Sequence, residues 1–420
     1  MDVAFARWHS ASSGYSATSE RAKGSQNRTG CDFVIETSTP LPTVEAAPRT
    51  LFIPIQAGTL QIRTRREEWP LEACLACATR QNPRRLYLFV SKVLGKHWPV
   101  KPSLMRAVHR SLAEKIADLP GPLLVIGLAE TATALGRGVA EEAALQTGRD
   151  DVLYLQTTRY LLSHHLAFSF DESHSHAPDH AVYRPDPTLR PLFNAAKSLV
   201  LVDDEISTGR TLLELARAYL RANLDIEQVA LVCITNWLSL ERQRKIGEVL
   251  GRPVRFPALI EGEFCFDPKP DFPPPELPLV IAQPDRRHDH ITADPARTGV
   301  LAGHWRLPPL PDLPLDRPLA VIGTGEYAYT PFRVALAWEE RGCDVRFQST
   351  TRSPILLGDA ITSRREFWDN YGDAIPNYLY NLDPDRLPVI CYEHPAMLLE
   401  HSLAAQISGL SWVTEPACRD

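Results

Sequence analysis

The chain has 420 residues, 44% of them hydrophobic and 23% charged, so it is long enough to bury the cores of two domains. Its formal net charge of −6, with no dominant basic run, argues against binding to nucleic acid or to a membrane surface. No apolar run approaches the roughly 18 to 20 residues needed to span a bilayer. The N-terminus also lacks an apolar signal core, so we expect a cytoplasmic protein.

The first part of the chain divides into a tail and a domain. Residues 1–49 are rich in Ser, Thr, Ala and Gly and lack apolar periodicity, which predicts a disordered tail. From residue 50 to residue 270, apolar strands alternate with amphipathic helices, which predicts an α/β domain. Cys74 and Cys77 form a CxxC pair on an expected helix. Because a four-thiolate zinc site needs a second pair, buried thiols are favoured over a metal or redox site.

Two segments of this domain place polar side chains beside an apolar strand. In residues 80–100, six basic side chains flank the strand: Arg80, Arg84, Arg85, Lys92, Lys96 and His97. Together they are suited to a hood that faces an anion. Taken singly, each is typical of solvated surface charge. In residues 123–138, "LLVIGLAETATALGRG", the pattern predicts a strand over 123–126, a turn and a helix. The turn holds Ala129, Glu130, Thr131 and Thr133. Its amides and hydroxyls are suited to an anion, and a packing turn of Gly and Ala is the alternative.

A histidine-rich segment follows Arg159. Residues 159–185, "RYLLSHHLAFSFDESHSHAPDHAVYRP", contain five histidines: His164, His165, His174, His176 and His180. A histidine there is suited to proton transfer near neutral pH. Glu172, His174 and His176 are also possible metal ligands, although their spacing fits no closed zinc site.

The sequence "LVLVDDEISTGRT", residues 199–211, predicts a strand, a turn and a helix. The short unalternated apolar run of 198–202 is typical of a fully buried parallel strand, and residues 211–220 are amphipathic and helical. Helix amides, Gly209 and the neighbouring hydroxyl groups are suited to a phosphate. Asp203 and Asp204, at the carboxyl end of the strand, are suited to a sugar diol or to metal-bound water. Together these features indicate a phosphorylated sugar as ligand.

The second part of the chain begins after a proline-rich region. Residues 267–318 concentrate proline, and we assign residues 271–295 as a linker and residues 296–420 as a second, smaller α/β domain. Three segments of the second domain resemble segments of the first in the same order, which suggests an internal duplication. The pairs are 125–143 with 321–340, 154–160 with 347–354, and 170–183 with 367–380. Convergent α/β patterns are the alternative.

The fourth expected match fails, because "LPVICYEHPAMLLEHSLA" lacks the paired acids and the Thr-Gly turn of the first domain. The second domain therefore lacks the means to hold a ribose phosphate in the same way. Its "GTGE" string lacks the third glycine of a dinucleotide fingerprint. Glu326, Arg352 and Ser353 could instead form a second polar site, or serve as caps and ion-pair partners.

The stretch "LVLVDDEISTGRT" resembles, over all 13 residues, the phosphoribosyl-pyrophosphate (PRPP) signature of type I phosphoribosyltransferases. This resemblance implies an orotate-phosphoribosyltransferase-like parallel sheet with flanking helices. It implies that Asp203 and Asp204 bind the ribose hydroxyls, with Mg²⁺ held indirectly. It further implies a PRPP-binding set around the 5′-phosphate and diphosphate: Glu205, Ile206, Ser207, Thr208, Gly209, Arg210, Thr211, Ala129, Glu130 and Thr131.

The same resemblance implies a flap that closes over PRPP, with Glu172, His174 and His176 as its candidates. Arg159 would assist departure of the diphosphate. The implied activity is Mg-dependent transfer of the phosphoribosyl group from PRPP to a nitrogenous base, with release of pyrophosphate. A non-catalytic sensor of PRPP or a nucleotide, and a phosphatase or nucleoside-cleaving enzyme, are the alternatives. A homodimer is the commonest assembly for such a protein.

Three strings of the second part, "GTGEY", "FQSTTRSPI" and "NYLYN", resemble the TRSP domain, whose name matches Thr351-Arg352-Ser353-Pro354. This domain follows an orotate-phosphoribosyltransferase-like domain in bacterial tellurite-resistance and stress operons. The two resemblances together cover residues 50–420. They imply a role in nucleoside-like metabolite synthesis or in stress resistance.

Overall fold

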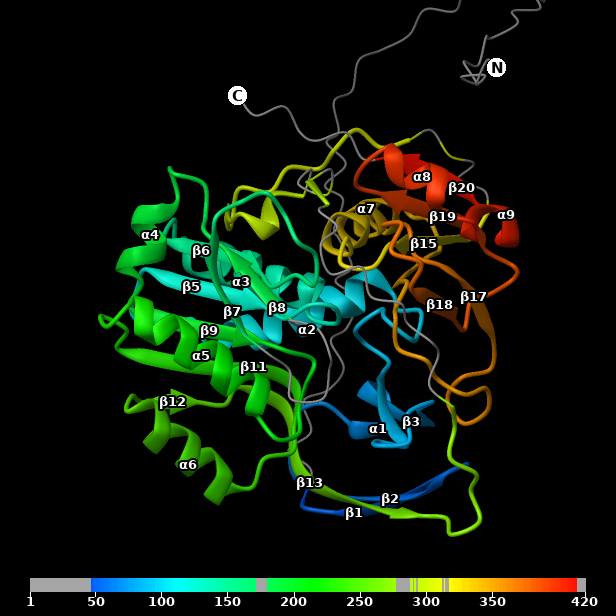
Figure 1. Cartoon of the computed structure of the whole chain (residues 1–420), viewed down its shortest axis with the longest axis horizontal. Coiled ribbons are helices and arrows are strands. Elements are labelled where there is room, and N and C mark those ends of the chain that lie inside the picture. The colour runs from blue at the N-terminus through cyan, green and yellow to red at the C-terminus, as the bar shows by residue number, and fades with distance from the viewer. Residues whose placement is uncertain are drawn as a thin grey trace, which may run out of the picture. The chain divides into compact units, whose positions relative to one another are not determined.

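The computed structural model describes residues 47–170, 180–276, 288–289, 291, 294–311, 313 and 317–413 (Figure 1). These residues belong to one compact unit, Pro40–Asp420. Residues 1–46, which form most of the expected tail, lie outside the described residues. Among the described residues, none of the helices has the length and apolar character needed to cross a membrane.

The largest element is a ten-stranded sheet whose centre is parallel. Its strand order is β1-β2-β13-β11-β9-β5-β6-β14, and β10 and β12 pair with β11. The bounds are β1 Thr50–Ile55, β2 Gly58–Glu67, β5 Leu123–Gly127, β6 Val152–Gln156, β9 Ser198–Val202, β10 Glu205–Ile206, β11 Gln228–Asn236, β12 Val254–Arg255, β13 Ala258–Pro268 and β14 Val300–Leu301. Strands β5, β6 and β9 are buried at every residue, as their unalternated apolar runs predict.

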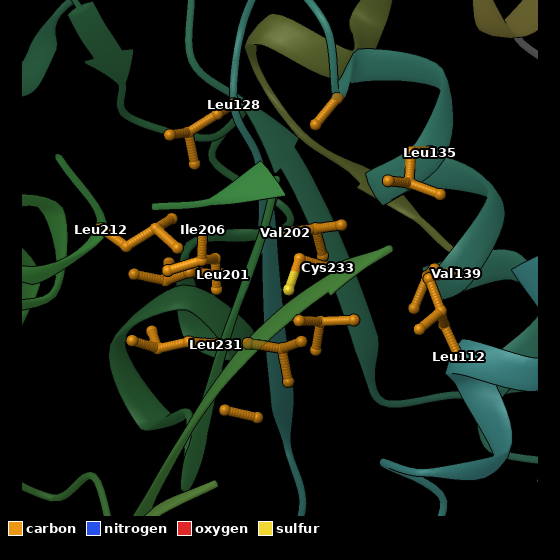
Figure 2. Packing of buried hydrophobic residues seen from close by; sticks show 14 of the residues in the cluster. Leu112, Leu128, Leu135, Val139, Leu201, Val202, Ile206, Leu212, Leu231 and Cys233 are labelled. Carbon is orange, nitrogen blue, oxygen red and sulfur yellow. The ribbon is translucent and has the colours of Figure 1, made fainter. Parts of the chain in front are cut away.

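Helices cover both faces of this sheet. On one face lie α2 (Pro102–Glu114) and α3 (Thr133–Thr147), and on the other lie α4 (Arg190–Ala195), α5 (Arg210–Ala222) and α6 (Leu240–Leu250). The apolar side chains between these layers form a continuous core, part of which is shown in Figure 2. Leu201 of β9 packs there with Ile206 and Leu212 on one side of the sheet, and Val202 points to the opposite side. Both ends of the turn between Val202 and Leu212 are therefore anchored in the core.

A small hairpin, β3 (Leu75–Thr79) with β4 (Tyr87–Ser91), lies beside the sheet and follows the short helix α1 (Leu71–Cys74). The expectation that Cys74 and Cys77 share a helix is wrong, because Cys77 pairs with Phe89 inside the hairpin. Both thiols are buried, and burial raises the pKa of each to about 12. The described residues contain no group of three or more His, Cys, Asp or Glu side chains arranged to hold a metal ion.

The second part of the chain forms a smaller parallel sheet of order β16-β15-β19-β20. Its elements are β15 Leu319–Gly323, α7 Tyr329–Glu340, β16 Val345–Ser349, β17 Arg364–Trp368, β18 Pro376–Tyr380, β19 Leu387–Tyr392, α8 Ala396–Glu400, α9 Leu403–Ile407 and β20 Leu410–Val413. Between the two sheets, the 3₁₀ turn Pro295–Arg297 precedes β14, which pairs with β6. The chain therefore returns to the first sheet before it enters the second.

The two sheets share a topology. In the first, the strand order is β9-β5-β6, and the antiparallel hairpin of β7 (Leu166–Phe170) and β8 (His180–Tyr183) follows β6 along the chain. In the second, the order is β19-β15-β16, and the antiparallel hairpin of β17 and β18 follows β16. Helix α3 follows β5, as α7 follows β15. The order of elements thus repeats over the segments whose sequences resemble each other.

Candidate active site

A pocket of about 820 Å³ opens at the carboxyl ends of β5 and β9. Four segments line it: the loop 128–131 after β5, the turn 203–212 after β9, residues 80–89 of the β3–β4 hairpin, and residues 351–353 after β16. Arg159, His180, His97 and Phe264 complete the wall. Loops at the carboxyl ends of parallel strands commonly build binding sites in such sheets, because the strands hold their backbones in place.

The turn after β9 has the geometry of an anion site. Its residues 205–206 form β10, which pairs with β11 and holds the turn open. Gly209 is the N-cap of α5 and has a φ of 69°, a left-handed conformation that other residues adopt at a cost. A Cβ atom at Gly209 would lie 2.9 Å from Cδ1 of Ile246. The turn is therefore tight on its inner side, and the N-terminus of α5 faces the pocket wall.

The two aspartates connect this turn to the loop after β5. The hydroxyl of Thr131 donates a hydrogen bond to Oδ1 of Asp204 at 2.8 Å. Oδ1 of Asp203 accepts the backbone amide of Asp204 at 3.0 Å. Both carboxylates are half-buried and line the pocket. Their carboxylates therefore lie where the turn after β9 meets the loop after β5.

Glu205 joins the turn to the basic hairpin. Nη2 of Arg85 donates to both carboxylate oxygens of Glu205, at 2.8 and 3.1 Å. Burial, with a contribution from Asp204, raises the pKa of Glu205, while Arg85 opposes the rise. The guanidinium carbon of Arg85 also lies 4.9 Å from the centroid of the Tyr87 ring. The hairpin is thus fixed over the pocket by a half-buried charged contact.

The loop after β5 is held by partners on several elements. The backbone amide of Ala129 donates to the hydroxyl of Thr157 at 2.8 Å. Glu130 lies 2.8 Å from Nζ of Lys96 and 4.0 Å from Nε of Arg352. Burial works against ionisation of Glu130, but Lys96 and Arg352 outweigh it and hold its pKa below the usual value. This carboxylate is therefore charged, and it neutralises cations at this end of the pocket.

Arg159 and His180 form another part of the pocket wall. The backbone amide of Arg159 donates to Oε1 of Glu326 at 2.9 Å, and its side chain lines the pocket. Nδ1 of His180 lies 3.0 Å from the hydroxyl of Thr157. Burial and the nearby Arg159 lower the pKa of His180 well below its usual value, so its ring is neutral near pH 7.

The three candidates of the second domain separate in the structure. Arg352 and Ser353 line the same pocket as the aspartates, together with Thr351. Glu326 is buried and lies behind the pocket wall, where it accepts hydrogen bonds from the hydroxyl of Thr158 at 2.7 Å and from Arg297 at 3.2 Å. These residues therefore do not form a second site of their own.

The pocket gathers nearly all of the other expected site residues. Its wall includes every residue of 203–211, the segment 129–131, Arg159 and the basic side chains Arg80, Arg84 and Arg85. Glu172, His174 and His176 lie outside the described residues. Sequence reasoning missed Tyr87, Phe89, Phe264 and Thr351 as wall residues. The resemblance of "STTRS" to "TTRY" was a signal for Thr351, whereas the three aromatic residues read as ordinary core positions.

Comparisons with known proteins bear on both parts of the chain. A family model described as phosphoribosyl transferase matches residues 74–263. A second model, described as the TRSP domain C-terminal to that transferase domain, matches residues 312–407. No protein of curated function matches the sequence.

Several solved structures resemble the chain. An adenine phosphoribosyltransferase from Giardia lamblia in complex with 9-deazaadenine is 18% identical; the match covers 38% of this chain and 80% of that one, with a TM-score of 0.27. An adenine phosphoribosyltransferase from Trypanosoma brucei, in complex with AMP, pyrophosphate and ribose-5-phosphate, is 15% identical over 37% and 65% of the two chains, with a TM-score of 0.28. An orotate phosphoribosyltransferase from Mycobacterium tuberculosis is 14% identical over 44% and 89%, with a TM-score of 0.27.

Proposed function

The chain is a transferase that carries a phosphoribosyl transferase domain followed by a TRSP domain, and from this premise we propose the reaction that its pocket performs. The phosphoribosyl group of PRPP passes to a ring nitrogen of a nucleobase-like acceptor. The bond between C1 of the ribose and the diphosphate oxygen breaks, the bond from C1 to nitrogen forms, and the acceptor loses one proton. Pyrophosphate is the second product.

The observation that carries this proposal is the meeting of two anion-facing turns and two carboxylates in one pocket. The amides and hydroxyls of residues 207–211 bind the 5′-phosphate, as the N-terminus of a helix favours. Asp203 and Asp204 accept hydrogen bonds from the ribose hydroxyls and so orient C1. Residues 129–131 face the diphosphate, and Arg159 stabilises the charge that develops on it as it leaves.

The carboxylates also fit a magnesium ion. Mg²⁺ prefers oxygen ligands and is commonly held by one or two carboxylates, by water and by substrate phosphates. Asp203 and Asp204 supply such oxygens at the edge of the pocket. When bound with PRPP, the ion would neutralise charge on the diphosphate. We propose that these two residues hold it through water, because they also serve the ribose.

The acceptor would lie beneath the β3–β4 hairpin. Tyr87, Phe89 and Phe264 form a cluster of edge-on rings with centroids 4.9 to 5.9 Å apart, which offers an apolar wall to a flat heterocycle. Arg80 and Arg84 also line the pocket. From the TRSP resemblance we propose a cytoplasmic pathway that makes a nucleoside-like metabolite in the response to tellurite or other stress. Deletion of the gene should then increase sensitivity to tellurite.

Calorimetric titration with PRPP and Mg²⁺ tests the ligand. The double variant Asp203→Asn/Asp204→Asn should lose PRPP binding, whereas Asp150→Asn, an exposed residue remote from the pocket wall, should bind as the wild type does. Equal PRPP affinity in the double variant and the wild type would contradict the assignment. A pyrophosphate-release assay across purines, pyrimidines and amines then separates a transferase from a protein that only senses PRPP, since a sensor releases no pyrophosphate with any of them.

A further inference from the structure

The second sheet repeats the hydrogen bonds of the first sheet as well as its topology. In the first, the hydroxyl of Thr157 accepts the amide of Ala129 at 2.8 Å, and the amide of Thr157 donates to the last residue of β5 at 3.0 Å. Thr350 makes both bonds in the second sheet, with Gly325 at 2.8 Å and with the last residue of β15 at 3.0 Å. The residue after each threonine bridges to the following hairpin in both sheets. Such agreement supports descent from one ancestral unit over convergence.

In the second copy, buried charged side chains occupy the place that corresponds to the aspartate pocket. The last residue of β5 pairs with Val202 and the last residue of β15 pairs with Cys391, so the position of Asp204 corresponds to Glu393. Glu393 is fully buried and accepts hydrogen bonds from Arg297 at 2.8 and 3.2 Å. Arg297, itself fully buried, also bonds to Glu326. The guanidinium of Arg297 thus lies between Glu326 and Glu393, which correspond to two residues of the first domain's pocket. In the first domain, the corresponding space is open.

The two copies contact each other reciprocally. Glu130 and Glu326 occupy the same position in "GLAE" and "GTGE", and Arg159 and Arg352 occupy the same position in "TTRY" and "TTRS". Glu130 lies 4.0 Å from Nε of Arg352, and Glu326 accepts the amide of Arg159. Helices α3 and α7, which are also equivalent, pack against each other. Contacts in which i meets j and j meets i are the mark of a two-fold interface between like subunits.

Across this interface, Arg352 reaches the diphosphate end of the transferase pocket. Its side chain is 23% exposed and lies beside Glu130 of the loop after β5. Its guanidinium carbon lies 4.9 Å from the centroid of the Tyr160 ring, and Nη2 donates to the Tyr160 hydroxyl at 2.5 Å. The ring and the hydrogen bond fix the planar group in advance of binding, so little side-chain entropy is lost when an anion arrives.

We propose that the second domain is a diverged copy of the transferase fold that has lost its own pocket and completes the pocket of the first, with Arg352 binding the diphosphate of PRPP. The inference rests on the proposed function. It assigns one PRPP to each chain and makes the fused domain part of the binding site. Arg352 is the counterpart of Arg159, so the two equivalent arginines serve one pocket from opposite sides.

Three ligands and three variants of the full chain test this inference by calorimetry in the presence of Mg²⁺. The ligands are PRPP, inorganic diphosphate and ribose 5-phosphate, and the variants are Arg352→Gln, Arg352→Lys and Arg346→Gln. Arg346 is a matched control, because it lies on β16 of the same domain, is 29% exposed at its side chain and is absent from the pocket wall. Wild-type protein should bind one PRPP per chain.

Arg352→Gln should weaken PRPP and diphosphate about 10- to 100-fold, the loss expected for a hydrogen bond to a charged group. Its affinity for ribose 5-phosphate should stay within about twofold of wild type, because that ligand has no diphosphate. Arg352→Lys should bind diphosphate with an affinity between those of wild type and Arg352→Gln. Lysine keeps the positive charge but lacks the planar guanidinium that can donate two parallel hydrogen bonds. Arg346→Gln should match wild type for all three ligands.

Three results would overturn the inference. Equal losses of all three ligands in Arg352→Gln would make the arginine a structural residue, and unchanged diphosphate affinity would remove it from the site. Two molecules of PRPP per chain would show that the second copy keeps a pocket of its own. Failure of the wild-type protein to bind either PRPP or ribose 5-phosphate would instead refute the proposed function. The first three results leave the proposed function intact. Failure of the inference about Arg352 can therefore be distinguished from failure of the proposed function.

Discussion

Replacement of Gly209 by alanine tests whether the turn after β9 holds the 5′-phosphate. Gly209 has a φ of 69°, and a left-handed conformation costs about 1 to 2 kcal/mol in a residue with a Cβ. The added methyl group would also lie 2.9 Å from Cδ1 of Ile246, the end of a flexible side chain, for an overpacking cost of about 1 kcal/mol or more. We therefore expect Gly209→Ala to lower the free energy of unfolding by about 2 to 4 kcal/mol and to shift the turn.

Gly251 provides a matched control. It has a φ of 61° at the C-cap of α6, and a Cβ there meets nothing within 4 Å. Gly251→Ala therefore carries the dihedral cost without the steric one, and it lies away from the pocket. Unfolding entropies of about 2.1 cal/mol/K per residue turn these costs into a fall in Tm of roughly 1 to 2 °C for Gly251→Ala and 2 to 4 °C for Gly209→Ala.

Thermal unfolding by circular dichroism gives the stabilities, and calorimetry with ribose 5-phosphate at 20 °C gives the affinities. Gly209→Ala should weaken ribose 5-phosphate about 10- to 100-fold, because one or more amides would no longer point at the phosphate. Gly251→Ala should bind as wild type does. If Gly209→Ala is folded and binds ribose 5-phosphate with unchanged affinity, the 5′-phosphate does not lie in this turn and the reasoning is refuted.

Two further predictions concern stability. Arg297→Met should lower the free energy of unfolding by about 3 to 5 kcal/mol, because it leaves the carboxylates of Glu326 and Glu393 buried without their charged partner. Adding Glu393→Leu should recover part of this loss. Denaturant titrations in which the losses of the two substitutions simply add would contradict the coupling. Burial, helped by two nearby arginines, lowers the pKa of His109 to about 3, below the ordinary value near 6.5. The contribution of the neutral His109 ring to stability is therefore fully present above pH 6.5 and is lost as the pH falls towards 3. Between pH 6 and pH 5, wild type should lose about 1.2 kcal/mol more stability than His109→Leu, and parallel pH profiles would show that this ring does not titrate on unfolding.

The sequence allowed the first sheet and its turn to be predicted closely. The expected strand over 198–202 is β9, and the expected helix over 211–220 lies within α5. These predictions succeed because a short unalternated apolar run and an amphipathic run are local signals. The shared helix for Cys74 and Cys77 fails for the opposite reason, since the hairpin partner that draws Cys77 into a strand lies ten or more residues away.

The candidate site divides in the same way. Residues 203–211 and residues 129–131 each lie in one continuous segment between a strand and a helix. The strand and the helix are local signals, and they are enough to orient the residues between them toward the pocket. Arg352 and Glu326 are 26 residues apart in the sequence, and their polar chemistry alone gives no sign that one lines the first domain's pocket while the other lies behind its wall. That separation depends on how the two copies face each other, which only the packing of α3 against α7 reveals.

The buried ion pairs of Arg297 indicate how charged groups fill the place of a pocket in the second copy. A carboxylate at the position of Asp204 is useful when ligand and water reach it, and is costly once it is buried. Burial raises the pKa of Glu393 to about 7 although Arg297 opposes the rise. Arg297 can balance only one of its two carboxylate neighbours, so partial protonation of Glu393 near neutral pH brings the buried group close to charge balance. Loss of the second pocket thus required an arginine from the segment between the domains, and the same segment attaches the second copy to β6 of the first.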